Sequence, residues 1–192
     1  EASAGSVDFF GKELFHLKPN EMSDLRLKEM GFVFQQMYML KNLSLYDNII
    51  LPAYQSPEGK SKKGRLQIQQ RAKMLMQKLH IADVSDNGVN EVSGGQLQRA
   101  CIARALINQP KIIFADEPTG ALDTKSARLL MEKLQEINLR RGRTILMVTH
   151  DPNAASFCSR ILFIQDGVIF HELRRKIPNE TQEDFYARIL QV

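Results

Sequence analysis

The sequence predicts an α/β fold with a mainly parallel sheet, and two features support this prediction. Short apolar runs at residues 32–35, 111–115 and 144–148 alternate with longer stretches of helical periodicity. The last of these runs is continuous and rich in β-branched residues, which is typical of a strand covered on both faces. With 192 residues, 43% of them hydrophobic, the chain is long enough for one domain, residues 1–192, with its own core.

The other elements follow from local signals along the chain. An extended run precedes the Gly11-Lys12 turn, and a helix that opens at Pro19 should run through Met30 and stop at Gly31. Residues 36–42 have no clear period and are expected to form a loop. The remaining predictions are a strand at 6–10, helices at 44–53, 66–80, 93–108 and 124–141, a short helix near 154, a hairpin of 160–165 with 168–173, and a last helix from 181.

The middle of the chain, residues 44–108, is mostly helical in pattern and is predicted to form a helical subdomain. Ser44 and Ser93 are good N-caps for its first and last helices. Residues 55–64 are polar and are expected to form a loop tip. The apolar stripe of the helix that follows is predicted to consist of Leu66, Met74, Leu75 and Leu79.

Thr181 and Asp184 form a possible capping box for the last helix. Its apolar stripe is expected to contain Phe185, Ile189 and Val192.

Charge and cysteine content exclude few classes of protein but favour an ordinary reduced domain. The formal net charge is +4, and the basic residues are mostly scattered, which favours solvated surface charge over a nucleic-acid patch. Cys101 and Cys158 have no metal-ligand spacing and are predicted to be buried, reduced thiols. No apolar run is long enough for a membrane span and no signal peptide is visible, so we expect any membrane role to depend on a partner chain.

Two adjacent carboxylates at the end of an apolar run are the strongest chemical signal. Asp116 and Glu117 directly follow Ile112-Ile113-Phe114-Ala115. Ligands of open α/β sheets bind beyond the carboxyl ends of the strands. There, one carboxylate can hold Mg²⁺ against phosphate and the next can orient or deprotonate a water molecule. The alternative is that the two acids merely begin a turn before Pro118.

A glycine-rich helix start is the second signal. Ser93, Gly94, Gly95 and Gln96 precede a helical pattern, and the glycines allow a ligand to approach the backbone closely. Free amide groups at a helix start favour phosphate. The alternative is a simple helix N-terminus after a turn.

Three further polar residues each have a functional and a structural interpretation. His150 follows a predicted strand and could hydrogen-bond a phosphate, although a lone histidine is more often structural. Gln35 also follows a predicted strand and could reach a metal ion or water. Asp123 ends the run Gly120-Ala121-Leu122-Asp123, which by itself is only a turn before a helix.

These five pieces, in this order, resemble the ABC-type ATPase family over almost the whole chain. The resemblance makes Gln35 the Q-loop glutamine, which is associated with the metal ion, and makes Asp123 the D-loop aspartate. It makes Asp116 the Walker B aspartate that is associated with the metal ion, Glu117 the catalytic glutamate and His150 the switch histidine. The signature motif is Ser93, Gly94, Gly95 and Gln96, preceded by Val92 where the family more often has Leu. The implied fold is a P-loop NTPase-like core with a mainly parallel sheet and a helical subdomain.

Two segments are similar to particular branches of that family. Residues 114–123 and 34–40 look like the macrolide-exporter and lipoprotein-release branch. The C-terminal part, with the runs at 164–167 and 183–186, is similar to bacitracin-type peptide-antibiotic exporters.

The resemblance implies ATP and Mg²⁺ as cofactors, and a transmembrane permease and a second copy of the chain as partners. The two copies would pair head to tail, so that the helix starting at Ser93 faces the γ-phosphate bound by the other copy. The implied location is cytoplasmic and peripheral, on the inner face of the cell membrane, and no nucleic acid is expected. Four apolar residues would lie near a groove for the permease or else belong to the core: Tyr38, Met39, Leu40 and Leu45.

The sequence departs from the family at its phosphate-binding loop. The family pattern Gly-x-x-x-x-Gly-Lys-Ser/Thr is not found, and the run Gly59-Lys60-Ser61 has Tyr54 where the first glycine is needed. We therefore expect an N-terminal truncation that removed this loop, and little ATP hydrolysis by the chain as given. The alternative functions are an ABC ATPase acting on nucleic acid or ribosomes, and a non-hydrolytic remnant that only binds a partner.

Overall fold

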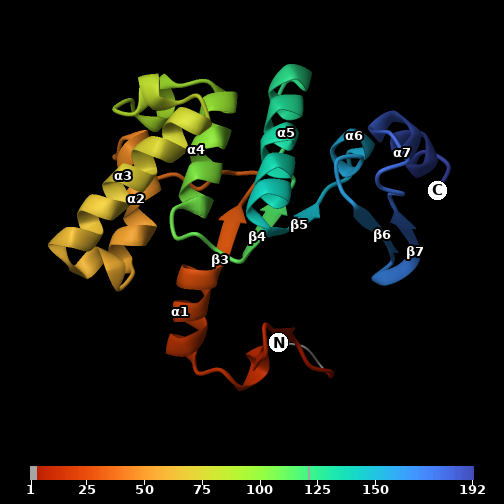
Figure 1. Cartoon of the computed structure of the whole chain (residues 1–192), viewed down its shortest axis with the longest axis horizontal. Helices are drawn as coiled ribbons and strands as arrows, with labels where there is room; N and C mark the ends of the chain where they lie inside the picture. Colours follow the sequence, from red (N-terminus) through yellow and green to blue (C-terminus); the bar gives the residue numbers. More distant parts are fainter. Residues whose placement is uncertain (1–3, 121) are drawn as a thin grey trace.

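The computed structural model describes residues 4–120 and 122–192 and has an α/β architecture (Figure 1). A short parallel sheet lies in the middle, with a group of helices on one side and a β-hairpin with a C-terminal helix on the other. The predicted fold class is confirmed. The strands and α-helices run in the order β1 Asp8–Phe9, β2 Lys12–Glu13, α1 Pro19–Glu29, β3 Met30–Val33, α2 Leu45–Gln55, α3 Lys62–Lys78, α4 Gly94–Leu106, β4 Ile112–Asp116, α5 Thr124–Arg141, β5 Thr144–Val148, α6 Pro152–Ala155, β6 Arg160–Gln165, β7 Val168–Arg174 and α7 Gln182–Ile189.

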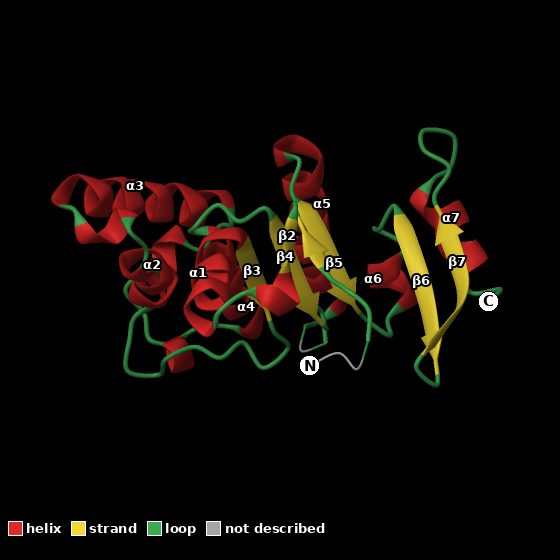
Figure 2. Ribbon diagram, turned by 90° about the horizontal axis from the view of Figure 1, so that it is seen from below, coloured by secondary structure: helices red, strands yellow, loops and turns green. Residues whose placement is uncertain are grey.

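The central sheet is parallel and has the strand order β3-β4-β5 (Figure 2). Ile113 pairs with Gly31 on one side and with Ile145 on the other. Because all three strands point the same way, their carboxyl ends meet at one edge of the sheet. The residues that follow β4 and β5 therefore come close together in space.

The first strand of this sheet is shifted from its predicted place. We expected residues 32–35, with the preceding helix reaching Met30 and stopping at Gly31, but β3 spans Met30–Val33 and α1 ends at Glu29. Pairing with β4 decides the boundary, because Lys111 N–H donates to the Glu29 carbonyl at 2.8 Å. Gly31 permits close packing rather than ending a helix, since a Cβ there would lie 2.7 Å from the Ala105 carbonyl oxygen.

Among the described residues the two faces of the sheet are covered unequally, and β5 is exposed on one of them, which corrects the prediction for residues 144–148. Val33 and Ile113 are buried in a core shared with α4 and α5. Leu146 and Val148, on the opposite side of β5, are 53% and 62% exposed. Side chains alternate between the two faces of a strand, so the continuous apolar run did not indicate burial on both.

Helices α2, α3 and α4 pack against one another beside the sheet. Their start signals work as predicted, because the side chains of Ser44 and Ser93 accept hydrogen bonds from the amides of Asp47 and Gln96. The predicted stripe on α3 is only half right. Leu75 and Leu79 are buried and Leu66 and Met74 are exposed, whereas Ile68, Ala72 and Met76 supply the rest of the buried face.

Gly64 in the first turn of α3 allows a close backbone contact that no larger residue fits. A Cβ on Gly64 would overlap the Glu58 carbonyl oxygen, which belongs to the backbone and cannot rotate away. Helix propensity favours Ala over Gly by about 1 kcal/mol, but overpacking costs about 1–3 kcal/mol and should win here. We expect Gly64→Ala to lower the free energy of unfolding by about 1–3 kcal/mol in urea titration.

Gly88→Ala is the matched control for this substitution. A Cβ on Gly88 meets only the flexible Glu91 side chain, at 3.5 Å, so its effect should stay within about 0.5 kcal/mol. Equal stabilities of the two variants would contradict the steric interpretation of Gly64.

At each end of the chain one element is shorter than the sequence indicated. The predicted strand at 6–10 shrinks to β1, which pairs with β2 in a short antiparallel hairpin. At the other end β6 and β7 form the expected hairpin and Thr181 caps α7 with the predicted capping box. Phe185 and Ile189 are buried, but Val192 is 50% exposed because α7 has already ended at Ile189.

The cysteines differ in their environments. Cys101 is buried as predicted, but Cys158 is only half-buried. Burial raises the pKa of the Cys101 thiol to about 11 and also raises the pKa of Cys158. At pH 8 both thiols should therefore be protonated in the folded protein.

We expect Cys158 to react with Ellman's reagent at least about ten-fold faster than Cys101 in the native state. Unfolding in urea should make the two rates equal, because the difference comes from burial. Fast native modification of Cys101, followed by mass spectrometry, would contradict this.

No helix within residues 4–120 and 122–192 combines the length and the apolar character that a membrane crossing requires.

Candidate functional site

The paired carboxylates lie at the carboxyl end of β4, as predicted. Asp116 is the last residue of the strand and is exposed. Glu117 has a left-handed backbone with φ +43°, and its N–H donates to the Val148 carbonyl at 2.9 Å. A non-glycine residue in that region is strained, and such strain clusters at functional sites. The strained backbone directs Glu117 across to the residues after β5.

The Glu117 carboxylate is held by the two residues that follow β5. Thr149 Oγ donates to it at 3.2 Å, the His150 backbone N–H donates at 3.0 Å, and His150 Nδ1 lies 2.6 Å from the same oxygen as the backbone N–H. Glu117 is only 17% exposed, whereas the His150 side chain is 85% exposed. The geometry thus brings Glu117 and His150 together at the strand ends. Thr149 was missed in the sequence, although its hydroxyl stands directly before the histidine.

Gln35, just after the end of β3, approaches the segment of residues 117–120 that follows β4. A Cβ built on Gly120 would lie 3.0 Å from Gln35 Nε2, so the absence of a side chain at Gly120 leaves room for the glutamine. The Gly120 N–H donates to the Glu117 carbonyl at 3.1 Å, which ties this contact to the carboxylate loop. Gln35, Asp116, Glu117 and His150 therefore surround one edge of the sheet.

The glycine-rich helix start forms a second cluster. Ser93 and Gln96 make a reciprocal capping box at the beginning of α4. A Cβ on Gly95 would lie 3.1 Å from Ser126 Oγ, so this helix start packs against the start of α5. The Gln96 amide donates to Ser93 Oγ at 3.2 Å, whereas the amides of Gly94 and Gly95 belong to the helix start, where the α-helix itself supplies no acceptor.

Asp123 belongs to this second cluster. It caps α5 by accepting from Ser126 N–H at 3.0 Å and from Ser126 Oγ at 2.7 Å. The Ser126 hydroxyl and amide lower the pKa of the Asp123 carboxyl. Asp123 is thus ionised and fixed at a helix start in this chain. The preceding Ala121 lies outside the described residues.

Gln98 connects the two clusters. Its side chain is buried, with 1% of the residue exposed, and its Nε2 donates to the Pro118 carbonyl at 2.8 Å. The contact joins the second turn of α4 to the residue that follows Glu117. The run Gln96-Leu97-Gln98-Arg99 at the glycine-rich helix start is unusual for a simple helix N-terminus, but the contact of Gln98 with Pro118 could not be predicted from the sequence.

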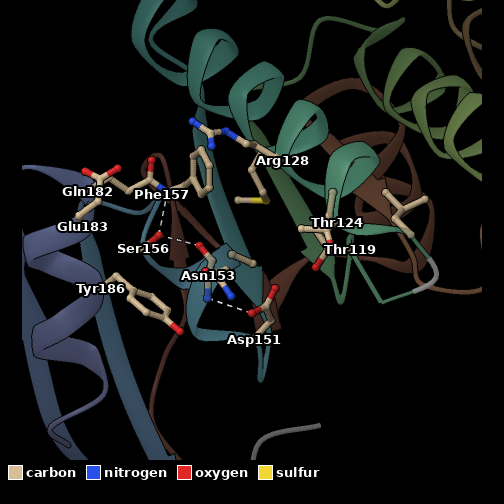
Figure 3. Close-up of a pocket in the computed structure, with 14 residues that line it drawn as sticks. Thr119, Thr124, Arg128, Asp151, Asn153, Ser156, Phe157, Gln182, Glu183 and Tyr186 are labelled. Atoms are coloured by element: carbon tan, nitrogen blue, oxygen red, sulfur yellow. Dashed lines mark hydrogen bonds between the residues drawn. The ribbon is translucent and has the colours of Figure 1, made fainter.

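A separate hollow of about 430 Å³ lies between α5, α6 and α7 (Figure 3). Leu122, Met131 and Phe157 supply apolar walls, and Asp151 lies at its edge. Gln182 closes one side by donating to Ser156 Oγ at 2.9 Å. Gln35, Asp116, Glu117 and His150 do not line it, so it is distinct from the strand-end cluster.

The apolar residues after Gln35 divide between groove and core. Tyr38 and Leu40 are 62% and 48% exposed and line a groove of about 590 Å³ with α1, β3, α2 and α4. Leu45 is fully buried and Met39 packs partly buried against the core. The groove interpretation therefore fits Tyr38 and Leu40, and the core interpretation fits Leu45.

The donor set suits magnesium better than a transition metal. The described part of the chain has no group of three or more His, Cys, Asp or Glu side chains that could hold a metal ion. Mg²⁺ is usually held by one or two carboxylates together with substrate phosphates and water. The exposed Asp116 carboxylate and the Gln35 amide oxygen could supply the protein's share of such a site.

Comparison with known proteins identifies the class to which this arrangement belongs. The family model described as "ABC transporter" matches residues 1–120, which is more than half of the chain. The chain therefore belongs to the ABC transporter family of ATP-binding proteins.

Individual relatives agree with this assignment. The chain is 44% identical over 188 residues to the bacitracin export ATP-binding protein BceA of Halalkalibacterium halodurans, covering 98% of this chain and 72% of that protein. It is 40% identical over 177 residues to the macrolide export ATP-binding/permease protein MacB of Psychrobacter cryohalolentis, covering 92% and 26% of the two chains.

A solved structure is also similar. It is the dimeric post-hydrolysis state of the ATP-binding cassette MJ0796 bound to ADP and Pi, with a TM-score of 0.79 and 34% identity. The similarity covers 90% of this chain and 74% of that one.

Proposed function

We propose that the chain belongs to the ATP-hydrolysing subunit of an ABC exporter, which works at the cytoplasmic face of a membrane with a permease partner and which completes its site with the phosphate-binding loop not found in the given sequence. The observation that supports this most is the Glu117 carboxylate, fixed by Thr149 and His150 beyond the ends of two parallel strands. That is where the γ-phosphate and the attacking water are expected in an α/β ATPase. The names of the relatives support export of a peptide antibiotic or a macrolide as the transport role.

The residues of the strand-end cluster divide the work of hydrolysis. Glu117 accepts a proton from water or orients it, and Thr149 keeps the carboxylate in place while it does so. His150 is exposed enough to leave Glu117 and donate a hydrogen bond to a phosphate. When bound, Mg²⁺ neutralises phosphate charge, and Asp116 and Gln35 are the residues proposed to hold it.

We further propose that two copies act together, head to tail. In one copy the start of α4, with Gly94 and Gly95, lies in a different cluster from Glu117, so a single chain does not enclose phosphate from both sides. Amides at a helix start that lack an acceptor within the helix bind anions. A second copy can place its Ser93–Gln96 turn against the phosphate that the first copy holds. The dimeric state of the similar MJ0796 cassette supports this pairing.

A mixing experiment tests both proposals. The full-length protein is expressed from its natural gene together with a candidate permease, and Mg²⁺-dependent ATP hydrolysis is measured. Glu117→Gln and Ser93→Arg should each abolish hydrolysis when present in every copy. In a mixture of the two variants, mixed dimers keep one intact site, so about a quarter of the sites should recover.

The possible outcomes separate the two proposals. Recovery on mixing supports a site shared between copies. Activity lost in both variants without recovery would contradict head-to-tail pairing but keep the ATPase, whereas full activity of Glu117→Gln would contradict the proposed catalytic role.

A further inference from the structure

The segment that follows β4, residues 117–120, is folded by short backbone contacts. The Glu117 N–H donates to the Val148 carbonyl at 2.9 Å, and the Gly120 N–H donates to the Glu117 carbonyl at 3.1 Å. Pro118, which follows Glu117 directly, is buried. Backbone hydrogen bonds therefore tie Glu117 both to the end of β5 and to its own segment.

A side chain of α4 adds a further contact from outside the segment. Gln98 is 1% exposed, and its Nε2 donates to the Pro118 carbonyl at 2.8 Å. Because both residues are buried, this hydrogen bond is shielded from competing water and is electrostatically stronger than an exposed one. It fixes the Pro118 carbonyl to a helix residue that lies 20 positions earlier in the chain.

Packing does not explain why position 98 carries an amide. The Gln98 Oε1 atom is buried and has no hydrogen-bond donor among the residues that the structure describes. A methionine side chain has nearly the same length and would occupy this place without such an atom, and a buried acceptor that lacks a donor is destabilising. The amide is therefore better explained by the hydrogen bond that it gives to Pro118 than by the stability of the core.

The Pro118 carbonyl is closely tied to the backbone of Glu117. The ring of Pro118 fixes its φ angle, so few free torsions separate this carbonyl from the Glu117 peptide. Glu117 has φ +43°, and strained conformations of that kind persist only where surrounding contacts fix them. Release of the carbonyl would let Glu117 rotate toward an ordinary negative φ, and its carboxylate would then move away from Thr149 and His150.

We propose that Gln98 is a positioning residue for Glu117, because it anchors the Pro118 carbonyl and so keeps the Glu117 carboxylate at the strand ends. This inference rests on the proposed function, in which Glu117 acts on the attacking water. Gln98 acts through the backbone beside Glu117. Its loss should slow the chemical step rather than weaken ATP binding, because a small misplacement of a catalytic group costs much of its rate.

Amide hydrogen exchange of the full-length protein tests the anchor independently of activity. Gln98→Met should raise the exchange rates of the Glu117 and Gly120 amides by about ten-fold or more, because the released segment opens more often. Gln135→Met is the matched control and should leave both rates unchanged. Gln135 also donates from its Nε2 atom to a backbone carbonyl, that of Phe157 at 3.4 Å, but in another part of the chain.

Steady-state ATP hydrolysis by the full-length protein tests the positioning role. Gln98→Met should lower kcat by about ten-fold or more and change KM by less than about two-fold, whereas Gln135→Met should change neither. Gln98→Asn keeps the amide but is shorter by one methylene group, so it should lose less of kcat. In a Glu117→Gln background, Gln98→Met should cause no further loss of the residual hydrolysis, because its effect passes through Glu117.

Each outcome decides one step of the inference. Unchanged exchange at Glu117 and Gly120 in Gln98→Met would overturn the anchor. Faster exchange with unchanged kcat, or an equal loss of kcat in the Glu117→Gln background, would overturn the positioning role. If Gln98→Met does not fold, Gln98→Asn takes its place in both measurements under the same criteria. If the unsubstituted full-length protein hydrolyses no ATP, the proposed function fails and the positioning role with it, while the exchange comparison still decides the anchor.

Discussion

Replacing Glu117 by Gln is expected to slow ATP hydrolysis by about 10²–10⁴-fold while leaving the fold and ATP binding in place. The amide keeps an oxygen that can accept from the His150 N–H but can no longer take up a proton from water. The effect should therefore fall on kcat, with little change in KM. Single-turnover measurements with the protein expressed from its natural gene would separate binding from hydrolysis.

Glu132→Gln is the matched control for Glu117→Gln. Glu132 pairs with Arg128 on the exposed side of α5, and both side chains are at least half exposed. Its replacement should leave hydrolysis unchanged, since exposed pairs contribute little even to stability. A Glu117→Gln protein as active as Glu132→Gln would show that another group activates water.

Replacing Phe185 by Ala is expected to give the largest loss of stability, about 3–5 kcal/mol. Phe185 is fully buried and is the centre of the small core formed by β6, β7 and α7. Leu173 and Ile189 complete that core, so few other side chains can fill the space that the ring leaves. Because this core is separate from the main one, we expect residues 160–192 to unfold first in denaturant, with faster amide exchange than the sheet.

Phe170→Ala, in β7 of the same C-terminal unit, provides the comparison. Phe170 is 53% exposed, and its removal should change the free energy of unfolding by no more than about 0.5 kcal/mol. Equal losses for the two phenylalanines would mean that α7 does not depend on the small core.

Local chemistry in the sequence was a good guide to helix starts and strand ends. Ser44, Ser93 and Thr181 cap helices as predicted, because a cap depends only on residues within one turn. Glu117 and His150 were expected to meet, because parallel strands end at the same edge. Predicting the caps required only the local sequence. Predicting that Glu117 and His150 meet required, in addition, only the order of the strands.

Burial and exact boundaries were less accessible from the sequence. Leu66 and Leu146 are apolar yet exposed, since apolar character by itself does not say which side of an element meets a neighbour. Gly31 lies within a strand because a partner strand and the Ala105 carbonyl determine its surroundings. Thr149 was passed over because a threonine next to a histidine has no distinctive spacing.

The sequence by itself determined the order of elements, the caps and the identity of the acids at the strand ends. Those features follow from local hydrogen bonding and from the period of apolar residues. Only the tertiary structure decided that Gln98 and Arg104 bridge from α4 to Pro118 and to the turn at Met37. Such contacts depend on which helix face meets which backbone carbonyl, and that is settled by packing between segments far apart in the chain.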